Sequence, residues 1–302
     1  MSVTADQLIT ETIGYLQSWS LDSEQMTTLA ADLQITDLAG TVTATRGVAT
    51  GISPGILEID QELLYCDTTT QVGAFTITPW GRGYLNTVAA FHPAGSKVIS
   101  QPTFPRAKVL DSLNEVMQRV FPDIFAVKIF EDTTKAVQVT YDLPDDAQWV
   151  LDARWQTPGG RLYWQGIRRW RISSGGGTQF GDTGITVDVA DRMAPGRPIE
   201  FRYAAKPQSL VNTTDDFETT TGLPSSLRDV VCLGAAAALT TSQELSRLEV
   251  SSVEQQNRSQ LVAPSAALTS SGFLEKRFQT RLAEERATLQ RLFPPRVTGS
   301  WR

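Results

Sequence analysis

The spacing of apolar positions predicts that the chain begins with helices. A capping box at Thr4–Gln7 opens the first helix, because the hydroxyl and amide side chains of such a pair satisfy free amides at a helix start. A second, shorter helix is expected to open at Asp22 or Ser23. The apolar positions at helical spacing are Ile9, Ile13 and Leu16 in the first helix, and Met26, Leu29 and Leu33 in the second. Residues 1–39 are therefore predicted to be the N-terminal helices.

From Gly40 the pattern changes to stretches rich in Thr, Val and Ile that alternate at the two-residue period of strands. Leu57 and Ile59 share one face of such a stretch. The strands are expected near residues 41–46, 56–66, 73–79 and 96–100. Residues 40–101 are therefore predicted to form a small antiparallel β unit.

A helical stripe then returns between residues 102 and 130, where one central helix is predicted to end at Phe121 and Pro122. The apolar residues of this stripe are Val109, Leu113, Val116, Met117 and Val120.

Residues 131–210 alternate again, in six or seven short strands joined by Gly-rich turns, which is typical of a β-sandwich. Four tryptophans fall within this stretch: Trp149, Trp155, Trp164 and Trp170. Two interpretations compete, an exposed platform for sugar rings and a thick sandwich core. Trp149 and Trp155 share the phase of Leu151, which favours the core.

Residues 211–293 are predicted to be the C-terminal helices, and residues 294–302 an extended tail. One helix carries Leu227, Val231, Ala235 and Leu239 on one side, and the last helix, at residues 273–293, carries Leu274, Phe278, Leu282, Leu289 and Phe293. The predicted fold class is α+β: a helical bundle from the N-terminal, central and C-terminal helices, with a small antiparallel β unit and an inserted β-sandwich.

Composition narrows the possible functions. The chain has 302 residues, of which 41% are hydrophobic, and a formal net charge of −6, which is not typical of a nucleic-acid-binding protein. Cys66 and Cys232 lack the spacing of a zinc site or a disulfide scaffold, so free buried thiols are expected, with a single bridge between them as the alternative. The first twenty residues do not resemble a signal peptide, and no apolar run is long enough to span a membrane, so a cytoplasm-like compartment is expected.

Catalytic and cofactor motifs are weak. "GISPG" at residues 51–55 matches the nucleophile elbow of hydrolases around Ser53, but Pro54 has no N–H to hold an oxyanion, and a strand pattern follows. His92, the single histidine, lies in a turn with Asp60 or Asp67 as its possible carboxylate partner. We expect a structural role for His92, no catalytic residue, no metal and no cofactor, and keep a Ser53–His92 hydrolase as an alternative.

Four stretches in register carry a resemblance to a known family: "GILEIDQELLYCD", "ITPWGRGYLNTVAAFHPAGSKVI", "PTFPRAKVLDSLNEVMQRVFP" and "GLPSSLRDVVCLGAAAAL". In this order they resemble neck proteins of tailed bacteriophages of actinobacteria, and the family suggested is the head-to-tail adaptor, or connector, protein. The resemblance covers roughly residues 40–125 and 220–250. The Trp-rich region is not part of the adaptor pattern.

The resemblance implies a structural virion protein at the neck, assembled in the host cytoplasm. It implies a homo-oligomeric ring, usually of twelve copies, that joins the portal protein to a stopper or tail-completion protein. Genomic DNA would pass through the ring without sequence-specific binding, and no membrane is involved. The interface residues expected on this basis are Phe293, Arg296, Trp301 and Arg302 near the tail, and Arg168, Arg169 and Arg171 on a basic strand. The alternative is a carbohydrate-binding accessory tail protein that uses the Trp-rich sandwich.

Overall fold

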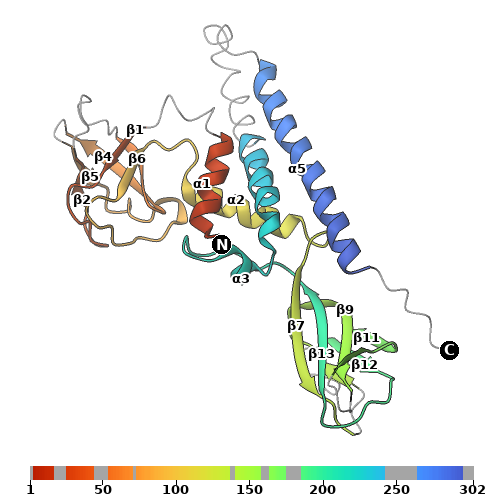
Figure 1. The fold of residues 1–302 in the computed structure, drawn as a ribbon. Coiled ribbons are helices and arrows are strands. Elements are labelled where there is room, and N and C mark those ends of the chain that lie inside the picture. Colours follow the sequence, from red (N-terminus) through yellow and green to blue (C-terminus); the bar gives the residue numbers. More distant parts are fainter. Residues whose placement is uncertain are drawn as a thin grey trace. The chain divides into compact units, whose positions relative to one another are not determined.

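The computed structural model describes residues 3–16, 25–43, 54–70, 73–136, 140–157, 163–174, 185–241 and 264–294. The chain divides into two compact units, which are coloured along the sequence in Figure 1. The first, here called the half-barrel unit, comprises Asp6–Glu115 and Val231–Phe278; the second, the sandwich unit, comprises Met1–Ala5, Val116–Val230 and Gln279–Arg302.

The half-barrel unit is built on a six-stranded antiparallel sheet that curls on itself (Figure 1). Its strands are β1 (Gln25–Thr28), β2 (Ala39–Thr41), β3 (Gly55–Ile59), β4 (Glu62–Thr69), β5 (Ala74–Ile77) and β6 (Lys97–Ser100), in the order β1-β6-β3-β4-β5-β2. Leu57 and Ile59, predicted to share a face, are fully buried in its core together with Leu64 and Val98. Because the sheet curls, the apolar faces of these short strands surround one small core.

The short helix predicted to carry Met26, Leu29 and Leu33 is wrong. Met26 belongs to strand β1 and pairs with Ile99, while Leu29 and Leu33 form isolated bridges with Val42 and His92. The spacing of Met26, Leu29 and Leu33 is also compatible with an edge strand and the residues that follow it. Thr27 and Thr28 in addition favour an extended backbone. Long-range pairing with β6 therefore overrides the local helical pattern.

The predicted fold class, a helical bundle with a small β unit and an inserted sandwich, is also wrong. The described residues form a strand-rich mixed α/β protein with three sheets, of which the six-stranded half-barrel is the largest. The physical reason is strand length. β2 has three residues and β1 four, and so short a strand shows almost no periodicity in sequence. Periodicity alone therefore predicted too few strands and too large a share of helix.

The helices themselves were mostly anticipated. They are α1 (Ala5–Leu16), α2 (Arg106–Arg119), α3 (Phe217–Thr221), a helix over residues 228–241, and α5 (Pro264–Leu292), with short 3₁₀ turns η2 (Tyr84–Asn86) and η3 (Ser225–Leu227). Within the half-barrel unit, the Ser112 hydroxyl on α2 lies 3.4 Å from the Ala235 carbonyl, and the Cys232 thiol lies 3.6 Å from the Leu8 carbonyl on α1. Small side chains on the helix of residues 228–241 allow this close approach.

The sandwich unit contains two sheets around one core. A four-stranded sheet has the order β10-β9-β13-β7, and a three-stranded sheet the order β11-β12-β8. The strands are β7 (Ala126–Thr133), β8 (Thr140–Asp142), β9 (Ala147–Gln156), β10 (Trp164–Gly166), β11 (Trp170–Ser174), β12 (Ile185–Val189) and β13 (Pro198–Ala205). Phe201 of one sheet contacts Tyr141 of the other, with ring centroids 5.4 Å apart, and both side chains are fully buried.

A β-bulge in β9 separates two tryptophans that the sequence placed on one face. Strand β13 pairs Arg202 with Asp152 but the next residue, Tyr203, with Val150, so Leu151 is the extra residue. Trp155 packs against the sandwich core, while Trp149 contacts the rings of Phe121 and Phe125 instead. The prediction of a shared phase is therefore wrong, because one inserted residue reverses the alternation.

Candidate functional site

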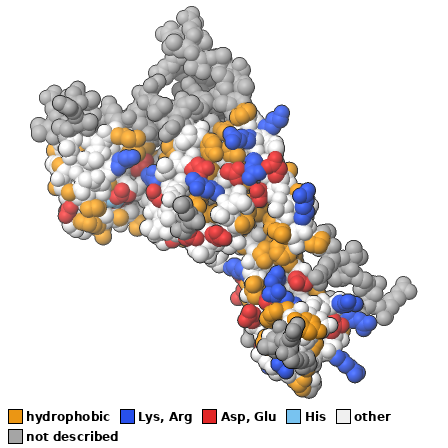
Figure 2. All heavy atoms as spheres, viewed as in Figure 1, with side chains coloured by type: hydrophobic (Ala, Val, Ile, Leu, Met, Phe, Trp, Pro, Cys, Tyr) orange, Lys and Arg blue, Asp and Glu red, His pale blue; other side chains and the backbone are white. Residues whose placement is uncertain are grey.

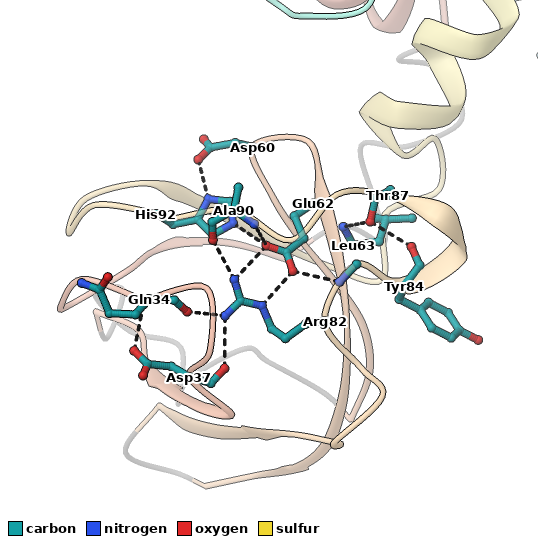
Figure 3. Close-up of polar contacts among 11 residues, drawn as sticks. Gln34, Asp37, Asp60, Glu62, Leu63, Arg82, Tyr84, Thr87, Ala90 and His92 are labelled. Atoms are coloured by element: carbon teal, nitrogen blue, oxygen red, sulfur yellow. Dashed lines mark hydrogen bonds and ion pairs between the residues drawn. The ribbon is translucent and has the colours of Figure 1, made fainter.

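A buried ionic network joins strand β4 to the long loop between β5 and β6 (Figure 3). Glu62, the first residue of β4, is 1% exposed. The Arg82 guanidinium donates two hydrogen bonds to its carboxylate, Nε to Oε1 at 2.7 Å and Nη2 to Oε2 at 3.0 Å. Two parallel bonds of this kind give the pair a defined geometry as well as charge neutralisation.

The same carboxylate and guanidinium also fix the backbone around them. Glu62 accepts hydrogen bonds from the amides of Gly83 and Ala90, each at 2.9 Å, so one side chain holds both ends of the intervening loop. Arg82 donates in turn to the carbonyls of Ala90 at 2.7 Å, Asp37 at 3.1 Å, and Gln34. Arg82 therefore fastens the turn at residues 34–37 beside this loop (Figure 3).

His92 completes the network between two carboxylates. Its Nδ1 lies 2.9 Å from Oδ2 of Asp60, and its Nε2 lies 2.9 Å from Oε2 of Glu62. The imidazole is 2% exposed. Because a carboxylate lies at each ring nitrogen, the imidazolium form of His92 donates both of its N–H groups. The two carboxylates therefore stabilise the positive charge of this form.

The ionisation of these groups follows from their contacts. Burial opposes a charge on His92, but hydrogen bonds to Asp60 and Glu62, and their negative charges, raise the His92 pKa to about 9. Burial likewise opposes the Glu62 carboxylate, but hydrogen bonds from His92, Arg82 and the two amides lower its pKa to about 2. The hydrogen bond from His92 lowers the pKa of Asp60 as well. At neutral pH the four charges alternate in sign and balance.

This geometry bears on the chemistry considered for His92. Both ring nitrogens face carboxylates, so neither is left to take a proton from a nucleophile. Ser53, the nucleophile of the hydrolase alternative, lies outside the described residues. Within the described residues, no group of histidine, cysteine and acidic side chains has the arrangement of a metal site. The network is suited to holding backbone in place.

The loop that this network holds carries a surface rich in exposed apolar side chains, which we call the apolar surface of the half-barrel. It consists of Trp80, Leu85, Val88 and Phe91 in the loop, Ile35 in the turn bound by Arg82, and Leu38 just after that turn. Trp80 also stacks on Tyr65, with ring centroids 4.9 Å apart. Leu85 has a positive φ of 54°, which is unfavourable for a leucine backbone, and its apolar side chain is 63% exposed. The surrounding contacts must maintain this conformation.

Gly81 lies where this loop passes close to β4, and it provides a test of the packing. A Cβ at Gly81 would lie 2.5 Å from the Tyr65 carbonyl oxygen and 2.6 Å from the Thr78 hydroxyl. We expect Gly81→Ala to lower the free energy of unfolding by about 1–3 kcal/mol, as overpacking does elsewhere. Gly14→Ala in α1, where the added Cβ meets nothing within 4 Å, is the control and should be neutral or stabilising. Urea unfolding measures both, and equal effects would contradict the packing described.

The interface residues expected from sequence are only partly described. Arg168, Arg169 and Arg171 are exposed, and the Asp191 carboxylate accepts hydrogen bonds from the first two backbone amides at 2.8 and 3.3 Å. Phe293 is half-buried just beyond α5, and its amide donates to the Leu289 carbonyl at 2.8 Å. The remaining three, Arg296, Trp301 and Arg302, lie outside the described residues.

The tryptophans of the sandwich unit do not make one exposed platform. Trp170 is 8% exposed in the core, and Trp155 packs against it. Trp164 is 38% exposed, but the Arg154 guanidinium covers its ring at 4.9 Å from the centroid. A flat aromatic surface for sugar rings therefore lacks support in the described residues.

Glu62 and Arg82 were not predicted as site residues, although Asp60 was a predicted partner of His92. The available signal was the pairing of an acidic residue in "EIDQEL" with the single arginine of "GRGY". Nothing in the spacing shows that strand β4 and the loop carrying Arg82 meet there.

Comparison with known proteins adds no identification. No protein-family model matches the chain, and no curated protein matches it significantly. Among the described helices, none combines the length and the apolar character that a membrane span requires.

Proposed function

We propose that the chain is a structural, non-enzymatic protein of a tailed-phage neck, a head-to-tail adaptor. One observation carries the proposal: the stretches that resemble adaptors contact one another. Glu62 in the first stretch binds Arg82 and His92 in the second, and the Glu58 carboxylate in the first accepts a hydrogen bond at 2.6 Å from the Arg106 amide at the start of α2 in the third. The separated motifs are thus parts of one structural module.

The chemistry of this module supports a role in binding. Its buried charges are used to hold a loop, and that loop exposes apolar side chains rather than a nucleophile or a metal-binding group. Preorganised apolar side chains on a rigid loop are suited to protein–protein contact, because little conformational entropy is lost on binding. In the proposed ring, copies would contact one another, the portal protein and a stopper or tail-completion protein, with DNA passing through the lumen.

The placement is tested by a phage that carries a nonsense mutation in this gene. The expected result is filled heads and separate tails that do not join, with joining restored by the protein supplied from a plasmid. Cryo-electron microscopy of the complemented virion should show the chain between the portal and the tail. Normal virions without the protein, or density elsewhere in the particle, would overturn the proposal.

A shorter chain tests the contribution of the tail. A variant ending at Phe293 lacks Trp301 and two arginines, which are common interface anchors. We expect this variant to fold normally but to enter necks at a level reduced at least several-fold, measured by quantitative mass spectrometry of purified particles. The matched control is the full chain with Ser300→Ala. Equal incorporation of the two would remove the tail from the proposed interface.

A further inference from the structure

The exposed large apolar side chains of this protein are unevenly distributed. Eight of the thirteen in the described residues lie in the half-barrel unit. Seven of these eight lie on its sheet and loops, and six of the seven form the apolar surface. Single exposed apolar residues are normal, but a gathered set marks an interaction site. Val88, at 82% exposed, and Leu85, at 63%, are the most prominent members.

This surface is held in a fixed shape. The Thr87 hydroxyl accepts a hydrogen bond from the Leu63 amide at 3.0 Å and donates one to the Tyr84 carbonyl at 2.9 Å (Figure 3). Leu85 and Asn86 both adopt positive φ angles. The ion pair of Arg82 and Glu62, and the hydrogen bond from the Gly83 amide to Glu62, hold the loop in place. Strained backbone kept rigid by so many contacts is characteristic of functional surfaces.

The charges near this surface are mostly negative. Among the described residues of the sheet and its loops, four aspartates and two basic residues are fully or partly exposed: Asp32, Asp37, Asp60, Asp67, Lys97 and Arg82. The Arg82 side chain is only 8% exposed and is already paired with Glu62. In Figure 2, orange and red side chains adjoin each other at the left, over the half-barrel. A matching partner therefore combines apolar anchors with positive charge.

We infer that the apolar surface of the half-barrel binds residues 294–302 of a second copy of this chain. Their sequence, PPRVTGSWR, has two arginines, one tryptophan and no acidic residue. The other basic candidate in the chain is the group of Arg168, Arg169 and Arg171 at the start of β11, and it has carboxylates close by. Asp191 accepts hydrogen bonds from the first two backbone amides, and Asp188 on β12 lies opposite Arg171 in the strand register. The segment at residues 294–302 is therefore the better electrostatic complement.

The inference rests on the proposed function, in which copies assemble side by side. A stretch of nine residues can span up to roughly 30 Å when extended, which makes a contact with a second copy geometrically accessible. Trp301 supplies the anchor against the exposed apolar side chains, and the two guanidinium groups face the aspartates. Such a head-to-tail contact uses different surfaces on the two copies and builds a ring when its rotation closes.

A peptide of residues 294–302 with a fluorescent label tests the contact against the chain ending at Phe293. We expect saturable binding by fluorescence anisotropy, weakened at least tenfold by Leu85→Asn with Val88→Ser, and similarly by Trp301→Ala in the peptide. Asparagine tolerates the positive φ of Leu85, so the double variant should keep its fold, and circular dichroism checks this. Val211→Ser with Phe273→Ser, at exposed apolar positions elsewhere, is the control and should bind unchanged.

The charge contribution has its own variant. Asp67→Asn should weaken peptide binding about two- to threefold and reduce its dependence on salt. Absence of saturable binding, or equal binding by the double variant and its control, would overturn the inference.

The second copy as the source of the segment is tested in the full chain. Light and isotopically heavy chains are mixed, with Trp301 replaced by the photo-crosslinker benzoylphenylalanine. We expect light–heavy crosslinks to residues 80–91; crosslinks confined within single chains would overturn this part. Because virion placement is tested by microscopy and complementation, a failure here leaves the adaptor proposal to be judged separately.

Discussion

Glu62→Gln is expected to lower the free energy of unfolding of the half-barrel unit by about 3–5 kcal/mol, the usual cost of breaking a buried ion pair from one side. The substitution removes the one negative charge that lies between Arg82 and His92. It also weakens the acceptor for the amides of Gly83 and Ala90. Two buried cations would then face each other across a neutral amide.

Native-state hydrogen exchange measures this loss directly in strands β3, β4 and β6. Asp67→Asn, an exposed change on the same strand, should stay within about 0.5 kcal/mol. Glu200→Gln is the counterpart in the sandwich unit, where Arg154 and Arg202 bind the buried carboxylate at 2.7 and 3.0 Å. It should leave half-barrel exchange unchanged. A loss below about 1 kcal/mol for Glu62→Gln would show that the network is not the main support of the loop.

His92→Gln is expected to remove most of the alkaline pH dependence of stability. The folded-state pKa of His92, about 9, exceeds its ordinary value of 6.5, so protonation favours the folded state. This contribution is complete below pH 6.5 and is lost as the pH rises through 9. A difference of this size corresponds to roughly 3 kcal/mol. The variant should therefore be less stable than the wild type at pH 6 and similar to it at pH 10.

Thermal unfolding between pH 6 and 10 tests the expectation for His92. The acidic side provides an internal comparison, because the Glu62 pKa is lowered from 4.5 to about 2. Its contribution is present above pH 4.5 and is lost as the pH falls toward 2, and this limb should persist in His92→Gln in weakened form. An alkaline limb that is as steep in the variant as in the wild type would mean that His92 is neutral in the folded protein.

The elements that sequence predicted well have a strong local pattern. The stripe of Val109, Leu113 and Val116 predicted a central helix, and all three are buried on α2. The last helix was also predicted, although α5 begins at Pro264, earlier than the expected residue 273. Local spacing sufficed in these cases because a helix satisfies its own backbone hydrogen bonds.

The failures concern information that is not local. Strand β1 forms because β6, some seventy residues later, supplies its partner. The bulge that separates Trp149 from Trp155 is a property of the pairing with β13. The site shows the same difference. His92 and Asp60 were identified from sequence as possible partners, but Glu62 and Arg82 join them only when strand β4 meets the loop between β5 and β6. Sequence periodicity does not predict which distant side chains come into contact.

The alternating charges of Asp60, His92, Glu62 and Arg82 also restrict how this protein can evolve. Replacing one member leaves a buried charge of opposite sign without its partner. A second substitution is then needed to restore the charge balance. The members should therefore be inherited or replaced as a set, with strong epistasis among them. Distant relatives would then be recognised by the joint occurrence of an acidic residue, an arginine twenty positions later and a histidine ten beyond that, even where the rest of the sequence has diverged.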